Sequence, residues 1–273
     1  MNGKYEKPLR YAMFAGLILA ALAIFFMAPW SERMGVSGSP QRVVLLWIFA
    51  VVGALPFAIY FMYKFSLHPE WNAMPGRFVE GMKVKTFSPY TYVAIGVVGA
   101  LFAVAGMTEG IRLDFQAMVI SASASLFGGI ISFFGLLVGQ IIARTLINPF
   151  WVSGNPAGML NVVPQSMFDA AIWAFAGYNY FKYVHSRPAG KAFLPAFLTA
   201  WVISEPVHQI GWVVGDYIIG NPWSAAALNI ARDYVVPQPG FPFLPYWVLS
   251  AFAFVPIGLL AGEAARRAWK GGR

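Results

Sequence analysis

The stretch SASASLFGGIISFFGLLVGQIIARTL, from Ser121 to Leu146, decides how many times this chain crosses a membrane. Read as one unit, it is a single long apolar helix. Read with a turn at Gly128 and Gly129, it joins two helices, because glycine is the usual residue where a chain changes direction sharply. The helix before that turn, Asp114 to Phe127, has only 14 residues. At 1.5 Å per residue it reaches about 21 Å, so we expect a short or tilted helix there.

Apolar runs of similar length lie on both sides of this stretch. Runs of about 18 or more mostly apolar residues are candidate membrane spans, because about 20 helical residues cross about 30 Å of hydrocarbon. The sequence therefore predicts an all-α membrane helix bundle. Its eight predicted spans are Tyr11 to Ala28, Val43 to Tyr63, Thr91 to Met107, Asp114 to Phe127, Ile130 to Ile147, Val162 to Val184, Ala192 to Ile219, and Leu244 to Ala264.

Positive charges fall in alternate gaps between these runs. Of the 19 Lys and Arg residues, 14 lie in four regions that share one side of the predicted bundle: Lys4, Lys7 and Arg10; Lys64, Arg77, Lys83 and Lys85; Lys182, Arg187 and Lys191; and Arg266, Arg267, Lys270 and Arg273. The opposite side has only Arg33, Arg42, Arg112, Arg144 and Arg232. Cationic connections stay cytoplasmic, so both termini are predicted inside. Reading the opening stretch as one span would reverse every later helix and abolish this asymmetry, so we favour the turn.

The composition agrees with a multi-pass protein of the cell membrane. Hydrophobic residues are 59% of the chain and charged residues 11%, against about 25% charged in ordinary soluble domains. The net charge of +8 needs no nucleic acid to explain it, because cations at cytoplasmic helix ends are attracted to anionic lipid headgroups. The absence of cysteine excludes disulfides and thiolate metal sites. The first run lacks a small-x-small cleavage site before Pro29, so we expect a retained helix rather than a signal peptide.

The longest cytoplasmic gap, 64–90, is the best candidate for a domain boundary. It contains Pro69, Pro75, Gly76 and Pro89, which interrupt regular structure. We therefore divide the chain into a two-helix amino-terminal membrane extension (1–63), a cytoplasmic linker (64–90) and a six-helix core (91–273).

Ionisable and aromatic residues share one face of the seventh predicted span. An ionisable side chain inside a bilayer costs at least about 2.5 to 3.5 kcal/mol, so each is a functional candidate unless it pairs or reaches the interface. Spacings of three and four residues place a set of side chains on one side of a helix. The set here is Trp201, Glu205, His208, Trp212 and Asp216.

The sixth predicted span shows the same pattern more mildly. Its polar face consists of Asn161, Gln165, Asp169 and Trp173, each four residues apart. The fifth span adds Gln140 and Arg144, one turn apart and near the outer end. Two antiparallel neighbours would bring Asp169 to the depth of His208 and Trp212. We expect an outward-facing pocket for a small polar ligand, in which carboxylates and rings favour a cationic aromatic one.

Two other interpretations of these residues differ in strength. In a structural interpretation, Asp169, Glu205 and Asp216 form buried ion pairs with Arg144 that fix helix register, without any ligand. Catalysis has less support. Glu205 and His208 have a carboxylate-bridged metal spacing, but such sites need a second copy, and the chain has only three His. Ser153 lacks the Gly two residues earlier that a serine nucleophile would favour, since Trp151 stands there. We expect no enzyme activity, no metal site and no cofactor.

The last six predicted spans resemble the substrate-binding S components of energy-coupling-factor vitamin transporters. The resemblance rests on YVAIGVVGALFAVAGM (Tyr92 to Met107), on the short outer loop TEGIRLDF, on the small-residue helix pair of the opening stretch, and on GNPAGML before the next helix. It covers about two thirds of the chain, and the two leading helices depart from that family.

The resemblance implies a ligand site on the outer side and a partner-docking face on the first core helix. The docking pair would be Gly96 and Ala100, or Gly99 and Ala103, with glycine in place of the family's alanine at the first position of each pair. Small residues four apart also serve ordinary helix packing. The implied partners are a transmembrane scaffold subunit and ATPase subunits.

The leading hypothesis is a membrane-embedded binding subunit for uptake of a small vitamin-like substrate. The chain has no Gly-x-x-x-x-Gly-Lys loop, so another polypeptide would hydrolyse the ATP. Two alternatives stay open: a self-sufficient transporter or channel whose buried acids relay protons, and a structural subunit of a larger membrane complex.

Overall fold

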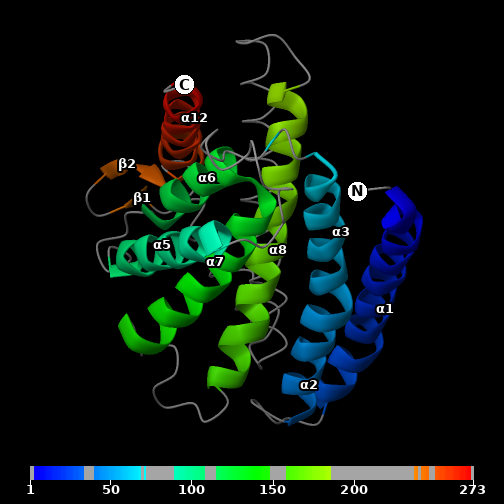
Figure 1. Ribbon diagram of the computed structural model, residues 1–273. Helices are drawn as coiled ribbons and strands as arrows, with labels where there is room; N and C mark the ends of the chain where they lie inside the picture. The colour runs from blue at the N-terminus through cyan, green and yellow to red at the C-terminus, as the bar shows by residue number, and fades with distance from the viewer. Residues whose placement is uncertain are drawn as a thin grey trace.

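The computed structural model of the chain is a bundle of helices (Figure 1). It describes residues 3–33, 40–68, 71, 89–107, 115–147, 158–185, 237–238, 241–245 and 250–271. Within these ranges the only strands are β1 (Pro237–Gln238) and β2 (Phe241–Pro245), which pair antiparallel. The predicted all-α class is therefore confirmed for the described residues apart from this one short strand pair.

The helical elements of the described residues include three π-helical segments. In order they are the 3-10 turn η1 (Gly3–Tyr5), α1 (Glu6–Arg33), α2 (Pro40–Ile48), the π-helix η2 (Phe49–Ala54), α3 (Leu55–Ser66), α5 (Pro89–Ala105), α6 (Phe115–Phe127), α7 (Gly129–Ile142), the π-helix η5 (Ala143–Ile147), α8 (Gly158–His185), the π-helix η7 (Ser250–Phe254) and α12 (Val255–Gly271). Segments η2, η5 and η7 each continue directly into or out of an α-helix.

The first six predicted helical segments coincide with these elements, and the eighth overlaps its helix but was predicted to begin too early. The seventh, Ala192 to Ile219, lies outside the described residues. The eighth was expected from Leu244, whereas β2 continues to Pro245 and the helix at Ser250 runs to Gly271. The error has a local cause. Proline has no N–H and disfavours helical dihedrals in the residue before it, and β2 contains Pro242 and Pro245.

The predicted turn at Gly128 and Gly129 is present, and it is buried. Gly128 has a φ of 79°, which glycine adopts without strain, and its carbonyl accepts a hydrogen bond from the Ser132 hydroxyl at 2.8 Å. A Cβ on Gly128 would overlap the ring of Phe65 from α3. A Cβ on Gly129 would lie 2.6 Å from the Ala174 carbonyl oxygen of α8. The turn therefore needs glycine both for its dihedrals and for the close approach of its neighbours.

The second amino-terminal helical unit, which ends in α3, shares a core with the later helices of the bundle. One hydrophobic cluster contains Phe65 of α3, Ile120 of α6, Phe133 of α7, Phe181 of α8 and Leu259 of α12. The Phe65 and Phe181 rings meet edge to face, with centroids 5.2 Å apart. Aromatic pairs in this geometry add about 0.5 to 1.5 kcal/mol beyond the burial of their area. Apolar packing is thus continuous between α3 and the later helices.

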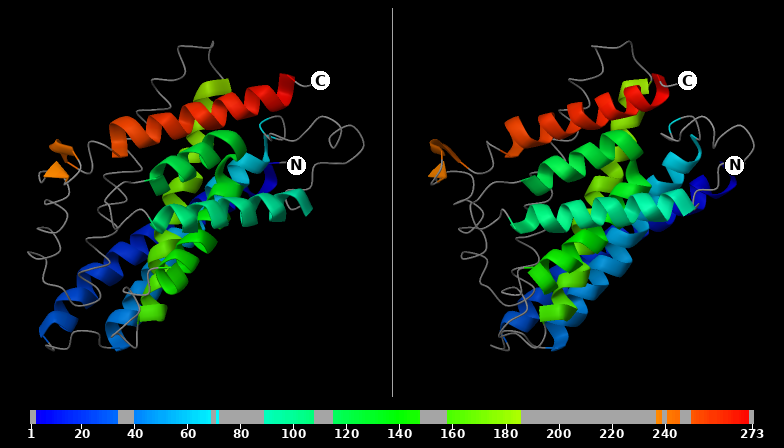
Figure 2. Two further views of the ribbon diagram at one scale, coloured as in Figure 1. Left: turned by 90° about the vertical axis from the view of Figure 1, so that its left-hand side faces the viewer. Right: turned by 60° about the vertical axis from the view of Figure 1, so that its left-hand side comes forward.

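Small residues let α12 lie directly on α6, as Figure 2 shows. A Cβ added to Gly258 would overlap Ser121, and one added to Gly262 would overlap Ser125. Glycines four residues apart on one helix, against serines four apart on the other, allow two backbones to approach closely. The same device joins α5 to α7, because a Cβ on Gly139 would lie 2.8 Å from the Gly99 carbonyl oxygen.

Two helices in the described part are long and apolar enough to cross a membrane. They span Val44–Ser66 and Gly129–Ile147, and two shorter apolar helices, Pro89–Ala105 and Phe115–Phe127, accompany them. Length and composition alone give this result, and a buried core helix of a soluble protein would satisfy the same test.

The cationic ends of several helices gather at one end of the bundle. Lys64, at the end of α3, donates a 2.7 Å hydrogen bond to Glu6, at the start of α1. This bond from Lys64 lowers the pKa of the Glu6 carboxyl below its usual value. The Arg266 guanidinium of α12 lies 5.4 Å from the centre of the Phe181 ring near the end of α8. Figure 1 shows the start of α1 and the ends of α3, α8 and α12 toward the same end of the molecule.

Candidate functional site

Asp169 lies in the first half of α8, on the face that the sequence predicted. Its side chain is 3% exposed. Trp173, one turn later, is also buried and belongs to the main hydrophobic cluster, where it serves packing. Gln165, one turn earlier, is half-buried. Asn161 lies one turn before Gln165, near the start of α8. The structure therefore singles out Asp169 as the buried carboxyl group on this face.

Two donors on the neighbouring helix converge on one oxygen of Asp169. Gln140, near the end of α7, donates from Nε2 to Asp169 Oδ2 at 2.7 Å. The Nη2 of Arg144, in the π-helical segment η5, lies 3.8 Å from the same oxygen. We call these residues, with Ser166 described below, the Asp169 cluster. Because Gln140 and Arg144 are four residues apart, they project from one side of the α7–η5 helix toward α8.

The cluster compensates the charge of its carboxylate internally. The side chain of Arg144 is 10% exposed, so both charges are largely removed from water. Removing charges from water costs several kcal/mol per ion, which an opposite charge and further hydrogen bonds offset. The Arg144–Asp169 pair has no net charge. The expected preference for a cationic ligand therefore depends on Glu205 and Asp216, which lie outside the described residues together with His208 and Trp212.

The Oε1 atom of Gln140 and the hydroxyl oxygen of Ser166, both in the cluster, have no hydrogen-bond partner within the described part of the chain. Gln140 is 6% exposed and Ser166 is completely buried. Ser166 precedes Asp169 by three residues and so lies on the same side of α8. A buried polar atom without a partner costs about 1 to 3 kcal/mol, so these two atoms are where a bound molecule would restore hydrogen bonding.

Both helices deviate from regular hydrogen bonding beside the cluster. Arg144 belongs to a π-helical turn, a feature that is frequent at functional sites. Pro164 lies inside α8, two residues before Ser166, and cannot donate a backbone hydrogen bond to the preceding turn. Sequence reasoning had singled out Arg144 and Asp169. It missed Ser166, because one serine in a mostly apolar helix is a weak signal.

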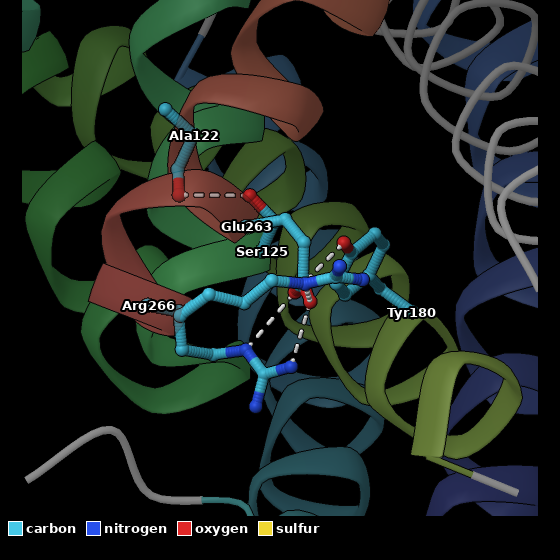
Figure 3. A network of polar contacts seen from close by, with 6 residues as sticks. Ala122, Ser125, Tyr180, Glu263 and Arg266 are labelled. Atoms are coloured by element: carbon cyan, nitrogen blue, oxygen red, sulfur yellow. Dashed lines mark hydrogen bonds and ion pairs between the residues drawn. The ribbon is translucent and has the colours of Figure 1, made fainter. Parts of the chain in front are cut away.

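A second polar network, which the sequence did not predict, lies near the other end of α8. Figure 3 shows Tyr180 and Arg266 directed at the carboxylate of Glu263. Arg266 donates to it at 2.9 and 3.0 Å, the exposed Arg267 donates at 2.7 Å, and the Tyr180 hydroxyl donates at 3.2 Å. Tyr180 and Glu263 are 83 residues apart in sequence, so no local pattern could have paired them. This network fastens α12 to α8.

The two candidate docking pairs on α5 have different surroundings. Gly99 and Ala103 are buried, and a Cβ on Gly99 would lie 3.3 Å from the Gly135 carbonyl oxygen of α7. Gly96 has no atom within 4 Å of the place where its Cβ would be, and Ala100 is exposed. Gly99 and Ala103 are therefore used within the chain. Only Gly96 and Ala100 are open to a partner.

Comparisons with known proteins found no relative of this chain. No protein-family model, no curated protein and no solved structure matches the chain. Among the described residues, no group of three or more His, Asp or Glu side chains comes together as a metal ligand set would. The contacts that the structure shows at the Asp169 cluster are hydrogen bonding and charge pairing.

Proposed function

We propose that this chain is a multispanning membrane protein that binds a small polar solute at its outer end and serves as the substrate-binding subunit of an uptake transporter. The observation that carries the proposal is the Asp169 cluster, a buried polar group set between two helices with hydrogen-bonding capacity left unused. Binding sites for small molecules combine apolar walls with a few placed polar groups of this kind.

The position of the cluster along the helices supports an outward-facing site. Arg144 lies 15 residues after Gly129, or about 22 Å from the buried turn by helical rise. That turn touches Phe65 near the end of α3, where cations gather. Cationic ends mark the cytoplasmic side, so Arg144 and Asp169 lie toward the opposite side of the membrane.

Eight spans with both termini in the cytoplasm remain the topology that we propose. Its support is the two long apolar helices, the two shorter ones and the gathering of cationic helix ends. In the bilayer α6 would be a short helix whose turn into α7 is enclosed by α3 and α8. Non-helical backbone is tolerated at membrane depth where protein covers it.

Energy for uptake would come from partner subunits. The sequence resemblance to S components of energy-coupling-factor transporters implies a membrane scaffold and ATPases, and the chain has no phosphate-binding loop of its own. The open small-residue pair Gly96 and Ala100 on α5 offers a face where a scaffold helix could approach closely.

A titration of the purified chain tests this proposal. Thiamine, riboflavin and nicotinamide, titrated calorimetrically into the wild-type protein, represent cationic, large neutral and small neutral solutes. We expect at least one to bind more tightly than millimolar. We expect Asp169→Asn to weaken that binding roughly 5- to 30-fold, the equivalent of about 1 to 2 kcal/mol.

The matched control is Glu263→Gln, which makes the same change at the other paired carboxylate of α8 and α12. It should leave binding unchanged, because Glu263 belongs to the network near the opposite end of α8. The Arg144–Asp169 ion pair also favours a second candidate, a purely structural subunit of a membrane complex. That candidate is preferred if no solute binds, or if Asp169→Asn binds as well as the wild type.

A further inference from the structure

The polar atoms of the Asp169 cluster that lack a hydrogen bond indicate the chemical class of its ligand. Gln140 directs its amide N–H at Asp169 and keeps Oε1, which only accepts hydrogen bonds. The Ser166 hydroxyl, which accepts and donates, is a second unused group. A molecule that satisfies both must present at least one N–H or O–H donor to Gln140.

The charge of the cluster points to the same class. The Asp169 carboxylate is already paired with Arg144 and bonded by Gln140 at a single oxygen, Oδ2. A cationic ligand would have to compete with Arg144 for this carboxylate, and an anionic ligand would meet Asp169 beside the arginine. A neutral ligand disturbs neither charge, and in a largely buried site it avoids the desolvation of a further ion.

We infer that the Asp169 cluster recognises a neutral, amide- or imide-like group, which donates N–H to Gln140 Oε1 and hydrogen-bonds with the Ser166 hydroxyl. This inference depends on the proposed solute-binding function and departs from the cationic ligand that the sequence favoured. Gln140 and Ser166 are then specificity-determining residues, whereas the Arg144–Asp169 pair holds the Gln140 amide in position.

Ser166→Ala is the variant that tests the inference. It removes one hydroxyl that has no partner within the described part of the chain, so it should leave the ligand-free protein at least as stable as the wild type. Affinity for riboflavin, a neutral imide, or for nicotinamide, a neutral amide, should fall roughly 2- to 10-fold, as expected for one lost hydrogen bond. The matched control is Ser125→Ala, at a buried serine of α6 whose hydroxyl bonds to the Ala122 carbonyl at 3.1 Å (Figure 3). It should leave affinity unchanged.

The outcomes separate this inference from the proposed function. Weaker binding of a neutral probe by Ser166→Ala, with Ser125→Ala like the wild type, supports the inference. If thiamine binds more tightly than both neutral probes, or if Ser166→Ala binds every probe like the wild type, the inference is wrong while solute binding stands. Wild-type affinity of Ser166→Ala for every probe would mean that water alone satisfies the Ser166 hydroxyl. Failure of all three probes to bind the wild-type chain would remove the proposed function and this inference together.

Discussion

At the scale of single residues, Asp169 and Arg144 stabilise each other across two helices. Asp169→Asn leaves the arginine with a weaker partner, and Arg144→Met removes the positive charge beside the carboxylate while the Gln140 hydrogen bond stays. We expect each variant to lower the free energy of unfolding by about 1 to 3 kcal/mol. The double variant should lose less than the sum, by about 1 kcal/mol or more.

The free energy of unfolding is measured by circular dichroism in detergent micelles for the wild type, the two single variants and the double variant. Energies that add to within about 0.5 kcal/mol would show that the two side chains do not interact. In that case the 3.8 Å approach contributes nothing to folding.

Gly128 occupies a position that only glycine fits, because its φ is positive and Phe65 packs against it. Gly128→Ala combines a positive φ with overlap on the Phe65 ring, so we expect a loss of about 1 to 3 kcal/mol or more in unfolding free energy. Gly96→Ala is the matched control. Its new methyl group meets no atom within 4 Å, and alanine favours a helix over glycine by roughly 0.5 to 1 kcal/mol. Thermal unfolding should rank Gly96→Ala at or above the wild type and Gly128→Ala below it. The reverse order would contradict the buried turn.

At the scale of elements, the sequence predicted those features that leave a local pattern. Apolar run length located α1, α3, α5 and α8, and a glycine pair located the turn between α6 and α7. The start of the eighth helix was predicted too early because hydropathy does not register the missing N–H group of Pro245, which ends β2. The π-helical turns were not predicted, since they change hydrogen bonding without changing composition. Two of them, η2 and η7, immediately precede Leu55–Pro56 and Val255–Pro256, where a proline cannot complete the regular ladder.

Contacts between elements were predicted less well than the elements themselves. One interpretation of the sequence paired Arg144 with the acids Asp169, Glu205 and Asp216, because charges inside a membrane need partners. The structure places Arg144 beside Asp169. The sequence could not distinguish the pair Gly96 and Ala100 from the pair Gly99 and Ala103 on α5, because both pairs have the same helical spacing. Only the position of α7 shows that Gly99 and Ala103 are occupied within the chain.

The difference between these pairs gives a prediction about partner docking by α5. If the purified chain binds a probe, cells that carry Gly96→Leu should no longer take that probe up. The purified Gly96→Leu chain should still bind it, because only the open face of α5 changes. Gly99→Leu should reduce folded yield, since its side chain would enter the contact with Gly135 and α7. Normal uptake by Gly96→Leu would exclude this face of α5 as the docking surface.

At the scale of the whole molecule, α8 connects the two polar networks. Asp169 and Tyr180 are 11 residues apart, or about 16 Å along the helix. The Asp169 cluster fastens α8 to α7, and the Glu263 network fastens it to α12 where the cationic ends gather. In the proposed topology the first network faces outward and the second faces the cytoplasm.

Reporter fusions test this orientation without any ligand. A reporter after Arg273 should be active on the cytoplasmic side, and one inserted near Pro237 should be active outside. An external carboxyl terminus would contradict the eight-span topology and the depth that we assign to the Asp169 cluster.

The central claim is that this chain binds a small solute through the Asp169 cluster. Mass spectrometry of small molecules released from the chain after gentle purification tests it most directly, with wild type, Asp169→Asn and Glu263→Gln prepared in parallel. We predict one solute at near-stoichiometric amounts in the wild type and in Glu263→Gln, and several-fold less in Asp169→Asn. A wild-type chain that releases no solute, or equal release from all three proteins, would contradict the claim.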